Sequence, residues 1–572
     1  MFRVLLFVCG LLLFGCEAPE LLPIGGPRPK ATVPTNLTAG AARGDGETYY
    51  VSTNGDDNAS GLAPDAAWGS LDRINGTTFG PGDRILLEGG ATFRGNLEIV
   101  PERFRGTADR PILIGSSDGR PVEIVSDARP AVQIESVSGL TIERLRLIGN
   151  APSCDGSGFD GAHGINLLYE RGQRYAAITL SQIDISGYCV GVVARIARPS
   201  RLDGLHLTEV RATDNRAAGI VLLGDEPDPD GSLHLVDVRI VGGRAAGSPG
   251  VPRAESGAKF SGSGVFIAMA QGVRVERITV ADNGGQNSCI DAGVSGGGTS
   301  GIAIDGIDIE IRGAEVIGQR VAPDCPWQGG GITVSGRTLV VERNYTHRND
   351  GPGITIDNAE SGRRATVQRN VSLNDARRSS SDGGIRLGGG QGDYQIHHNT
   401  VFVARGPALV AQGEASAGIP REVSVRNNLF GVGEGPLLLV DPTSIEAPVF
   451  HGNHYFDATD RYLIAWGHEG FEGIARFVEG ADQERFGGQI LAETGNPHLC
   501  GTQIVSFADP DISAIAVAVR PGPGSPLRDT GINLASVQGA RLAPTDFSGT
   551  TVPAGRGPDR GAIEHPGGLD GC

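Results

Sequence analysis

The feature that most constrains the fold is a repeat that runs through most of the chain. Its clearest copy lies in Val367–Phe402, where a Val-x-x-Asn segment ending at Asn370 returns as an Ile-x-x-Asn segment ending at Asn399. One Gly-apolar-x-apolar segment, Gly384–Leu387, lies between them. A unit of this size is too small to bury a hydrophobic core alone, so each copy must stack on its neighbours.

The same landmark can be followed along the chain. In each copy an apolar residue and two variable residues precede a residue that faces inward. The landmarks are Leu145, Ile183, Val210, Val238, Ile278, Ile307, Asn344, Asn370, Asn399, Asn428 and Asn453. Their spacing is 25–29 residues, apart from three longer repeats. We predict coils of short parallel strands, with the asparagines stacked at one inward corner, where each amide bonds to the adjacent coil.

The Gly-apolar-x-apolar segments predict one strand of each coil. Side chains alternate along a strand, so the x residues point outward and form a row across one sheet. The predicted row is Asn166, Val221, Phe266, Asp291, Thr333, Thr355 and Arg386, with Ser335 and Asp357 in the next outward position. Adjacent coils lie about 4.8 Å apart, which places Asp357 beside Arg386.

Composition and charge narrow the class of partner. The chain of 572 residues has 89 glycines and 5% aromatic residues, which suits many short strands joined by tight turns. Its net charge of −17 argues against nucleic acid or an anionic membrane surface as the main partner. An acidic polysaccharide is not excluded as a partner, because a bound cation or a local arginine can reverse the sign of the electrostatic potential at the binding site.

The N-terminus predicts export. One arginine precedes an apolar run, Val4–Phe14, that is too short to span a membrane stably. The following Leu13-Phe14-Gly15-Cys16 resembles the lipobox of bacterial lipoproteins, which implies cleavage before Cys16 and lipidation of its thiol. Residues 17–47 are rich in Pro, Gly, Ala and Thr and predict a flexible tether. We expect a protein of the cell envelope, lipid-anchored at the outer membrane, with a secreted protein as the alternative.

The cysteines beyond this signal predict disulfides. Their number is even, and an exported chain meets an oxidising environment. The pairing we expect is Cys154 with Cys189, Cys289 with Cys325, and Cys500 with Cys572, although the sequence leaves other pairings open.

The repeat resembles that of pectate-lyase-like right-handed parallel β-helix proteins, and the resemblance covers most of residues 48–453. Segments at the beginning of this region and beyond its end strengthen the resemblance, because they are similar to the opening and closing motifs of exported bacterial β-helix proteins that act on polysaccharides. These segments are Tyr49–Asp57, Trp68–Leu71, Pro81–Asp83, Gly524–Gly531 and Asp559–Glu564. The resemblance implies an all-β fold: a right-handed parallel β-helix with its N-terminal cap over residues 48–456, and a C-terminal cap region over 457–572. A helix is expected within Gly470–Phe486.

Three insertions, near residues 150–163, 243–262 and 318–330, precede strands of the outward row. Long loops on one face of a solenoid usually form the walls of its binding surface. They carry His163, Lys259 and Trp327, of which Trp327 suits stacking on a sugar ring. By contrast, we expect His347, His397 and His398 to be exposed turn residues.

The preferred hypothesis is β-elimination of a uronic-acid glycan. This reaction needs a positive charge to neutralise the carboxylate and a base to remove the C5 proton. The resemblance implies Ca²⁺ held by acidic side chains, with Lys or Arg as the base. The residues we assign to catalysis are Arg386, Lys259, Asp357, Asp382 and His163. Those assigned to substrate are Asp291, Thr333, Thr355 and Trp327, and those assigned to Ca²⁺ are Asp350, Asp357 and Asp291.

We expect a monomer that acts on polysaccharide, and two alternatives to the lyase remain open. A retaining hydrolase would use Asp382 with Asp350 or Asp357, and an inverting one would use Asp291 with Asp357, because the two mechanisms need different carboxyl separations. A non-catalytic glycan-binding protein is favoured by the apolar outward residues Val221 and Phe266.

Overall fold

The computed structural model describes residues 46–127, 129–150, 154, 162–251, 260–286, 300–322, 329–357, 364–379, 381–413, 419–501, 515–537, 541–565 and 572. The chain divides into two compact units, Met1–Ala42 and Arg43–Cys572. The predicted signal, the lipidation site Cys16 and the first part of the tether lie outside the described residues. Within the described part, no helix is long and apolar enough to cross a membrane.

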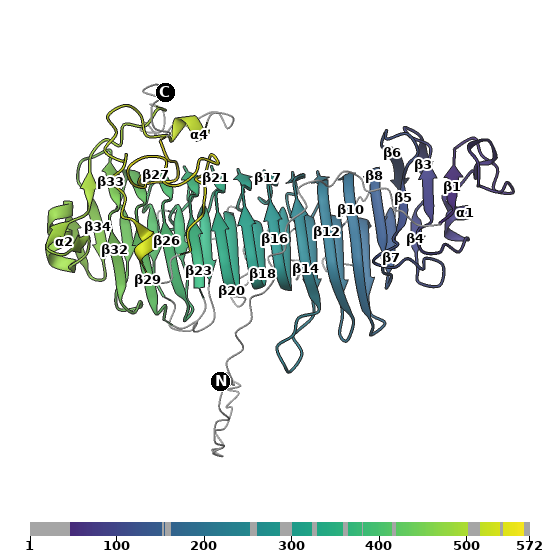
Figure 1. The fold of residues 1–572 in the computed structure, drawn as a ribbon, viewed down its shortest axis with the longest axis horizontal. Helices are drawn as coiled ribbons and strands as arrows, with labels where there is room; N and C mark the ends of the chain where they lie inside the picture. Colours follow the sequence, from purple (N-terminus) through teal and green to yellow (C-terminus); the bar gives the residue numbers. More distant parts are fainter. Residues whose placement is uncertain are drawn as a thin grey trace, which may run out of the picture. The chain divides into compact units, whose positions relative to one another are not determined.

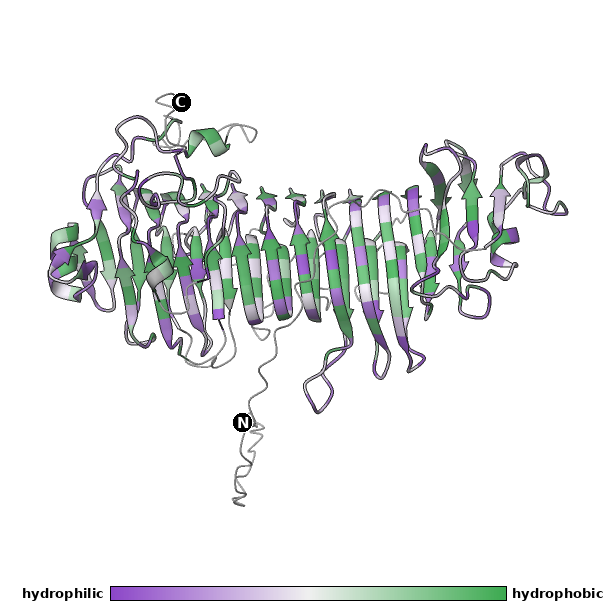
Figure 2. Ribbon diagram, viewed as in Figure 1, coloured by the Kyte–Doolittle hydropathy of each residue, from purple (hydrophilic) through white to green (hydrophobic). Residues whose placement is uncertain are grey.

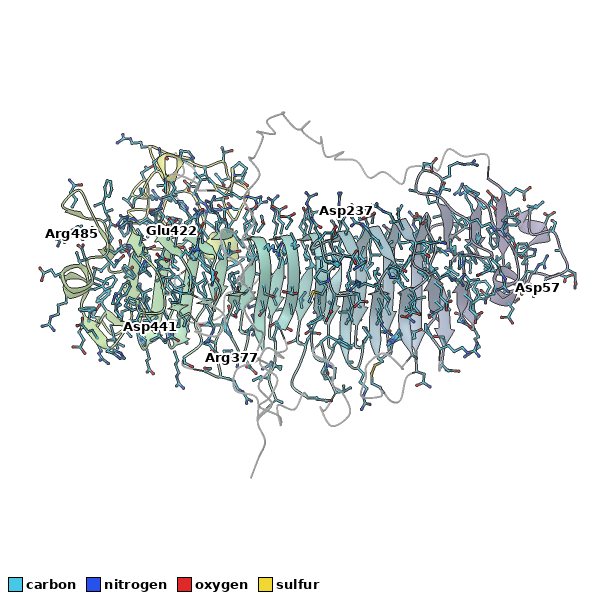
Figure 3. The ribbon with its side chains drawn as sticks, turned by 90° about the horizontal axis from the view of Figure 1, so that it is seen from below. Asp57, Asp237, Arg377, Glu422, Asp441 and Arg485 are labelled. Atoms are coloured by element: carbon cyan, nitrogen blue, oxygen red, sulfur yellow. A yellow bond between two sulfur atoms is a disulfide. The ribbon has the colours of Figure 1, made fainter. Side chains whose placement is uncertain are left out.

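The second unit is a β-helix whose coils each contribute strands to three parallel stacks (Figure 1). We name them stacks A, B and C, and the chain passes through them repeatedly in the order C, A, B. Several long strands bend at a corner and belong to two stacks. Hydrophobic and hydrophilic residues alternate along many of the strands (Figure 2). Charged residues such as Asp237 and Glu422 project from the outside of the ribbon (Figure 3).

Stack A contains β1 (Thr48–Val51), β2 (Arg84–Leu87), β5 (Ile112–Ser116), β8 (Leu140–Gly149), β10 (Arg174–Ser186), β12 (Arg201–Thr213), β14 (Leu235–Val241), β16 (Val265–Glu276), β18 (Ser300–Arg312), β20 (Gly330–Glu342), β23 (Arg364–Gln368), β26 (Asp393–His397), β29 (Glu422–Arg426) and β32 (Pro448–His451). The long strands β8, β10 and β12 contribute only their first parts to this stack, and β16, β18 and β20 contribute only their second parts.

Stack B contains the second parts of β8, β10 and β12 together with β3 (Thr92–Arg94), β6 (Val122–Ser126), β15 (Arg244–Ala246), β17 (Thr279–Ala281), β19 (Glu315–Ile317), β21 (Tyr345–His347), β24 (Val371–Leu373), β27 (Thr400–Arg405), β30 (Leu429–Glu434), β33 (His454–Asp457) and β38 (Glu493–Thr494).

Stack C contains the first parts of β16, β18 and β20 together with β4 (Leu97–Ile99), β7 (Val132–Glu135), β9 (His163–Tyr169), β11 (Val190–Ile196), β13 (Ala218–Gly224), β22 (Ile354–Asp357), β25 (Ile385–Leu387), β28 (Leu409–Ala411), β31 (Leu438–Val440) and β34 (Leu463–Trp466).

The two ends of the coil stack are closed by short elements. At the N-terminal end these are η1 (Pro64–Ala66) and α1 (Leu71–Asn75), and at the C-terminal end β35 (Glu469–Glu472), α2 (Ile474–Ala481), β36 (Arg485–Phe486) and β37 (Gln489–Ile490). The chain then continues through α4 (Ile515–Ala518) and η4 (Leu534–Ser536). The expected helix within Gly470–Phe486 is α2, whose apolar residues Ile474, Phe477 and Val478 are buried.

The core is built from columns of inward apolar side chains in register. Ile332, Ile354 and Ile385 occupy equivalent positions on three successive strands of stack C, and none is exposed to solvent. Because every coil repeats this arrangement, the interior is one continuous apolar core that extends along the solenoid. This core fixes the register, since a slip of one residue would turn each of these side chains outward.

The predicted asparagine ladder occupies the corner between stacks A and B. In one step, the backbone N–H and Nδ2 of Asn370 both donate to Oδ1 of Asn399, at 3.0 Å each. The same pair of bonds joins the other asparagines from Asn344 to Asn453. Glu484 of the C-terminal cap ends the ladder, because its Oε1 accepts from Nδ2 of Asn453 at 2.6 Å. The prediction of a stacked inward corner is confirmed.

Two of the predicted corner positions are wrong. Val238 pairs with Leu205 inside stack A, and the corner of that coil is Gly243, directly before the Arg244 that pairs with Arg211. Ile307 likewise lies in β18, whereas the backbone N–H of Ala314 donates to Oδ1 of Asn344 at the corner. These two corners were missed because Gly243 and Ala314 stand where the other corners have Leu, Ile, Val or Asn.

The C-terminal part of the chain returns along stack B. Outward apolar residues of this stack pack against Leu527, Ala562 and Ile563; they are Tyr345, Val371, Leu373, Phe402, Leu429 and Phe456. The closing motif thus covers a side of the helix. Arg369 and Glu564 form a buried ion pair there, with Nη1 and Oε1 2.9 Å apart.

Two of the three predicted disulfides are confirmed, Cys154 with Cys189 and Cys500 with Cys572. The third predicted pair, Cys289 with Cys325, lies outside the described residues.

Candidate functional site

The register of stack C defines its outward row. The aligned residues are Glu98, Gln133, Asn166, Val193, Val221, Phe266, Ala303, Thr333, Thr355, Arg386, Val410, Leu439 and Ala465. All predicted members except Asp291 are in it. The position assigned to Asp291 belongs to Ala303, and Asp291 itself lies outside the described residues. The correction follows from the sequence, because Gly301–Ile304 fits the same Gly-apolar-x-apolar pattern.

Exposure divides this row into covered and open parts. Val193, Val221 and Val410 are completely buried although they point away from the coil core. Between them, five outward residues are partly exposed, and we call them the open window: Phe266, Ala303, Thr333, Thr355 and Arg386. The predicted row is therefore accessible over only part of its length.

Arg386 is the one cation in this described row, and it is held by Asp382. Its Nη1 donates to Oδ1 of Asp382 at 3.2 Å. The Arg386 side chain is 31% exposed and that of Asp382 7% exposed, so the pair is accessible from the arginine side. Burial raises the pKa of Asp382, while the positive charge of Arg386 and a hydrogen bond from Ser379 oppose that rise.

Hydroxyl groups line the middle of the open window. Oγ of Ser300 and Oγ1 of Thr333 lie 2.8 Å apart. In the second outward position, Ser335 donates to Oδ1 of Asp305 at 2.8 Å. Asp305, Ser335 and Asp357 occupy the same strand position on three successive coils, although only the backbone of Asp357 is described. Asp305 was missed because the strand of its coil was assigned to residues 289–292.

A second ladder of polar side chains sets the corner between stacks B and C, directly before the open window. It was not predicted, although its members follow the first corner by five residues, as in Asn344 and Asn349. Its members are Asn215, Asn283, Gln319, Asn349 and Asp375. Asp375 ends it, accepting from Nδ2 of Asn349 at 2.8 Å, and burial raises the pKa of Asp375 to about 6.

Asp350 has a structural position at this corner. It is 5% exposed, and its Oδ2 accepts the backbone N–H of Val321 at 3.1 Å. The carboxylate thereby fastens the connection that follows β19, and its role in binding Ca²⁺ stays a prediction. Within the described part of the chain, no three His, Cys, Asp or Glu side chains are grouped in a way that could hold a metal ion.

The histidine predictions need correction. His163 is 1% exposed and begins β9, seven strands away from β25 in stack C. Seven spacings correspond to roughly 34 Å, so the structure does not bring His163 to Arg386. His347, His397 and His398 are buried rather than exposed. Neighbouring strands and the C-terminal segment together cover this side of the coils. The predicted residues Lys259 and Trp327 lie outside the described residues.

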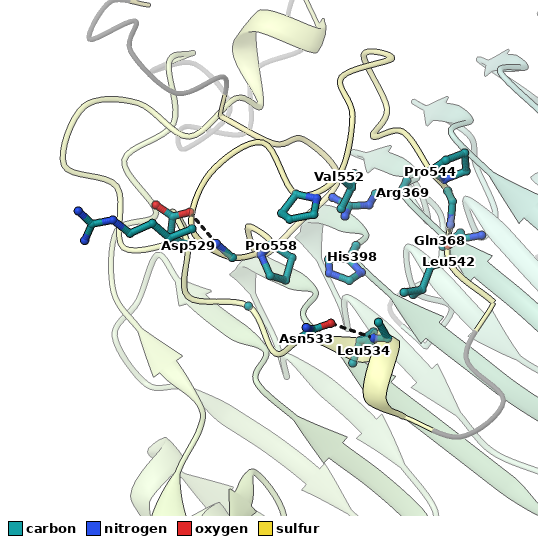
Figure 4. A pocket seen from close by; sticks show the side chains of 16 residues that line it. Gln368, Arg369, His398, Asp529, Asn533, Leu534, Leu542, Pro544, Val552 and Pro558 are labelled. Atoms are coloured by element: carbon teal, nitrogen blue, oxygen red, sulfur yellow. Dashed lines mark hydrogen bonds between the residues drawn. The ribbon is translucent and has the colours of Figure 1, made fainter.

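A cavity of about 610 Å³ lies under the C-terminal segment, at the corner of stacks A and B (Figure 4). Several of its polar side chains have partners within the chain. Gln368 donates to Glu342 and accepts from the backbone N–H of Ala543, and His398 contacts His397 and Asn427. The cavity is remote from stack C, and we assign no chemistry to it.

Residues 122–430 match the family model described as the right-handed β-helix region. The match covers more than half of the chain, and the protein belongs to this right-handed β-helix family. This confirms the predicted fold class and handedness. No curated protein matches the chain.

Several solved structures are similar to it. One is described as the complex structure of XylC with xylose, with 9% identity, a TM-score of 0.40, and coverage of 74% of this chain and 86% of that one. Another is pectate lyase Pel9A, with 13% identity, a TM-score of 0.32, and coverage of 91% and 96%. A third is the A-module of the Azotobacter vinelandii mannuronan C-5 epimerase AlgE6, with 11% identity, a TM-score of 0.35, and coverage of 73% and 91%.

Proposed function

We propose that the protein acts on polysaccharide at the open window of stack C, by β-elimination of a uronic-acid glycan. The observation that carries the proposal is the partly exposed Arg386, the one cation in the described row, beside a strip of hydroxyl groups. On a chain with a net charge of −17, an accessible guanidinium group marks a place where an anionic group is favoured.

Arg386 fits the need to bind and neutralise a uronate carboxylate. A guanidinium group presents several N–H donors in a planar fork and binds carboxylates bidentately. Asp382 takes a hydrogen bond from Nη1 and so restricts the orientation of this fork. The partly exposed hydroxyls of Thr333 and Thr355 can exchange hydrogen bonds with the hydroxyls of adjacent sugar residues.

β-Elimination also needs a base. The base removes the C5 proton, the electron pair forms the C4–C5 double bond, and the C4–O bond breaks as the leaving oxygen gains a proton. Lys259 remains our predicted base, with Arg386 as the alternative from within the window. A requirement for Ca²⁺ also remains a prediction, and a chelator such as EDTA tests it.

One observation favours an inverting hydrolase as the second candidate. Asp305 and Asp357 occupy the same strand position two coils apart. Two spacings correspond to roughly 9.6 Å between their backbones, close to the carboxyl separation of about 6.5–9.5 Å in inverting enzymes. This pair replaces the predicted pair of Asp291 with Asp357.

The reaction is tested by incubating the protein with alginate, pectate and chondroitin sulfate, with and without EDTA. Ultraviolet absorbance of unsaturated uronate ends identifies β-elimination, and its loss with EDTA identifies a required cation. New reducing ends without that absorbance identify hydrolysis. Retention of the protein on glycan columns without either product identifies a binding protein and contradicts the proposal.

We also propose that this activity takes place outside the cytoplasm. The two disulfides support an oxidising compartment. Lipidation at Cys16 is tested by labelling with a fatty acid in a bacterial host, where Cys16→Ser should abolish incorporation.

A further inference from the structure

The open window ends abruptly beyond Arg386. The next residue in the outward row, Val410, is completely buried. The backbone of Gly383 lies over it, since a Cβ atom added to Gly383 would be 3.0 Å from Cγ2 of Val410. Gly383 directly follows Asp382, so the segment that closes the row is also the segment that holds Arg386.

The other end of the window is closed by different residues. Val193 and Val221 are buried in an apolar cluster with Cys154, Val251 and Phe260. The disulfide of Cys154 with Cys189 ties part of this cover to the coil. From Phe266 to Arg386 there are four strand spacings, or roughly 19 Å. This continuous exposed stretch of the row is therefore a short site with Arg386 at its last position, although the row is partly exposed again at Leu439 and Ala465.

Resting on the proposed function, we infer that Arg386 recognises the carboxylate of the uronic-acid residue at the reducing end, so that the protein acts at glycan chain ends. This residue carries the glycosidic bond at C4 that β-elimination breaks, whereas a residue at the non-reducing end has no such bond. A chain that continued along the row beyond Arg386 would meet the Asp382–Gly383 segment. A terminal residue meets no such obstacle, and its carboxylate can lie against the exposed side of the guanidinium group. The substrate class is then a short uronic-acid oligosaccharide or the end of a long chain.

The first test compares product size with viscosity during digestion of the uronic-acid polymer that gives the highest turnover. Attack at chain ends predicts that the smallest products dominate from the earliest time points while the viscosity falls slowly. A rapid fall in viscosity, with an early mixture of long products, would overturn the inference.

The second test locates the recognised carboxylate. Binding is measured by calorimetry for a uronic-acid tetrasaccharide and for versions in which one carboxyl group, either terminal or internal, is reduced to the alcohol. Reduction of the carboxyl group at the reducing end should weaken binding at least about tenfold, the loss expected for one charge-assisted hydrogen bond. In Arg386→Gln this difference should disappear, whereas Arg405→Gln, on the exposed end of β27, should retain it. An equal or greater loss from an internal reduction would overturn the inference.

Different results would contradict the proposed reaction and the inferred recognition of a terminal residue. Turnover with an internal cleavage pattern overturns terminal recognition and leaves the proposed reaction standing. Absence of both turnover and binding with every uronic-acid glycan overturns the proposed function and this inference with it.

Discussion

At the scale of single residues, the proposed function depends on the pair formed by Arg386 and Asp382. Strand alternation predicted that Arg386 would point outward beside Thr355, and the register agrees. Alternation could not predict the burial of Val410, because covering segments come from outside the strand. The exposed and covered parts of the row therefore became visible only in three dimensions.

The burial of Asp382 gives turnover and stability opposite dependences on pH. As pH falls through the raised pKa of Asp382, the carboxylate is neutralised and Arg386 loses its ionic partner, so turnover should fall. The folded state binds this proton more tightly than the unfolded state, whose Asp has a pKa of about 3.9. The free energy of unfolding should therefore decrease as pH rises from about 4 through the folded pKa.

Asp382→Asn tests both dependences, because it retains a hydrogen-bond acceptor and removes the charge. Rate profiles and denaturant unfolding are measured over the same pH series. The variant should lose the acidic step in turnover and the corresponding part of the slope in stability. Unchanged profiles in both measurements would exclude Asp382 as the titrating group.

At the scale of elements, the corner ladders explain how coils of variable length stay in register. The first ladder was predictable because Asn recurs at a nearly constant spacing. The second was within reach of the sequence, since Asn283, Asn349 and Asp375 each follow a corner by five residues. Its mixture of Asn, Gln and Asp concealed the repeat.

Asn399→Ala tests the ladder in its interior. Asn399 accepts two hydrogen bonds from Asn370 and donates to Val367 and Asn428. The substitution leaves buried donors without acceptors, and the free energy of unfolding should fall by about 2–4 kcal/mol. The exposed Asn58→Ala is the matched control and should change it by less than about 0.5 kcal/mol. Equal effects of the two substitutions would argue against the ladder as a stabilising element.

Glu484 makes the end of the ladder sensitive to pH. Burial raises its pKa to about 7, although hydrogen bonds from Asn453 and Tyr455 oppose the rise. An unfolded Glu titrates near 4.3, so the folded state binds the proton more tightly, and the free energy of unfolding should fall as pH rises from about 4 to about 7. In Glu484→Gln, denaturant unfolding should show a flatter dependence over this range. A slope identical to that of the wild type would contradict the assignment.

At the scale of the whole molecule, the C-terminal segment acts as a brace along stack B. The closing motif Asp559–Glu564 was recognised in the sequence, but its position was not, because outward Val371, Phe402 and Leu429 do not indicate which segment covers them. The contacts are long-range: Ala562 donates to Oγ1 of Thr400 at 2.9 Å.

Arg369→Ala tests this brace. It leaves Glu564 buried without its cation, and breaking such a pair costs about 3–5 kcal/mol. Arg405→Ala removes an arginine that is 82% exposed, and it should have little effect. The two melting temperatures are compared with that of the wild type. A melting temperature of Arg369→Ala equal to that of Arg405→Ala would show that the ion pair does not hold the segment in place.

The most direct test of the central claim is the rate at which Arg386→Gln forms unsaturated uronate ends, measured beside the wild type and Arg405→Gln. The account predicts that Arg386→Gln loses at least about 99% of the turnover, since an interaction worth about 3 kcal/mol corresponds to roughly a hundredfold in rate. Its melting temperature should stay close to that of the wild type, and Arg405→Gln should retain full activity. Full turnover by a folded Arg386→Gln would contradict the account.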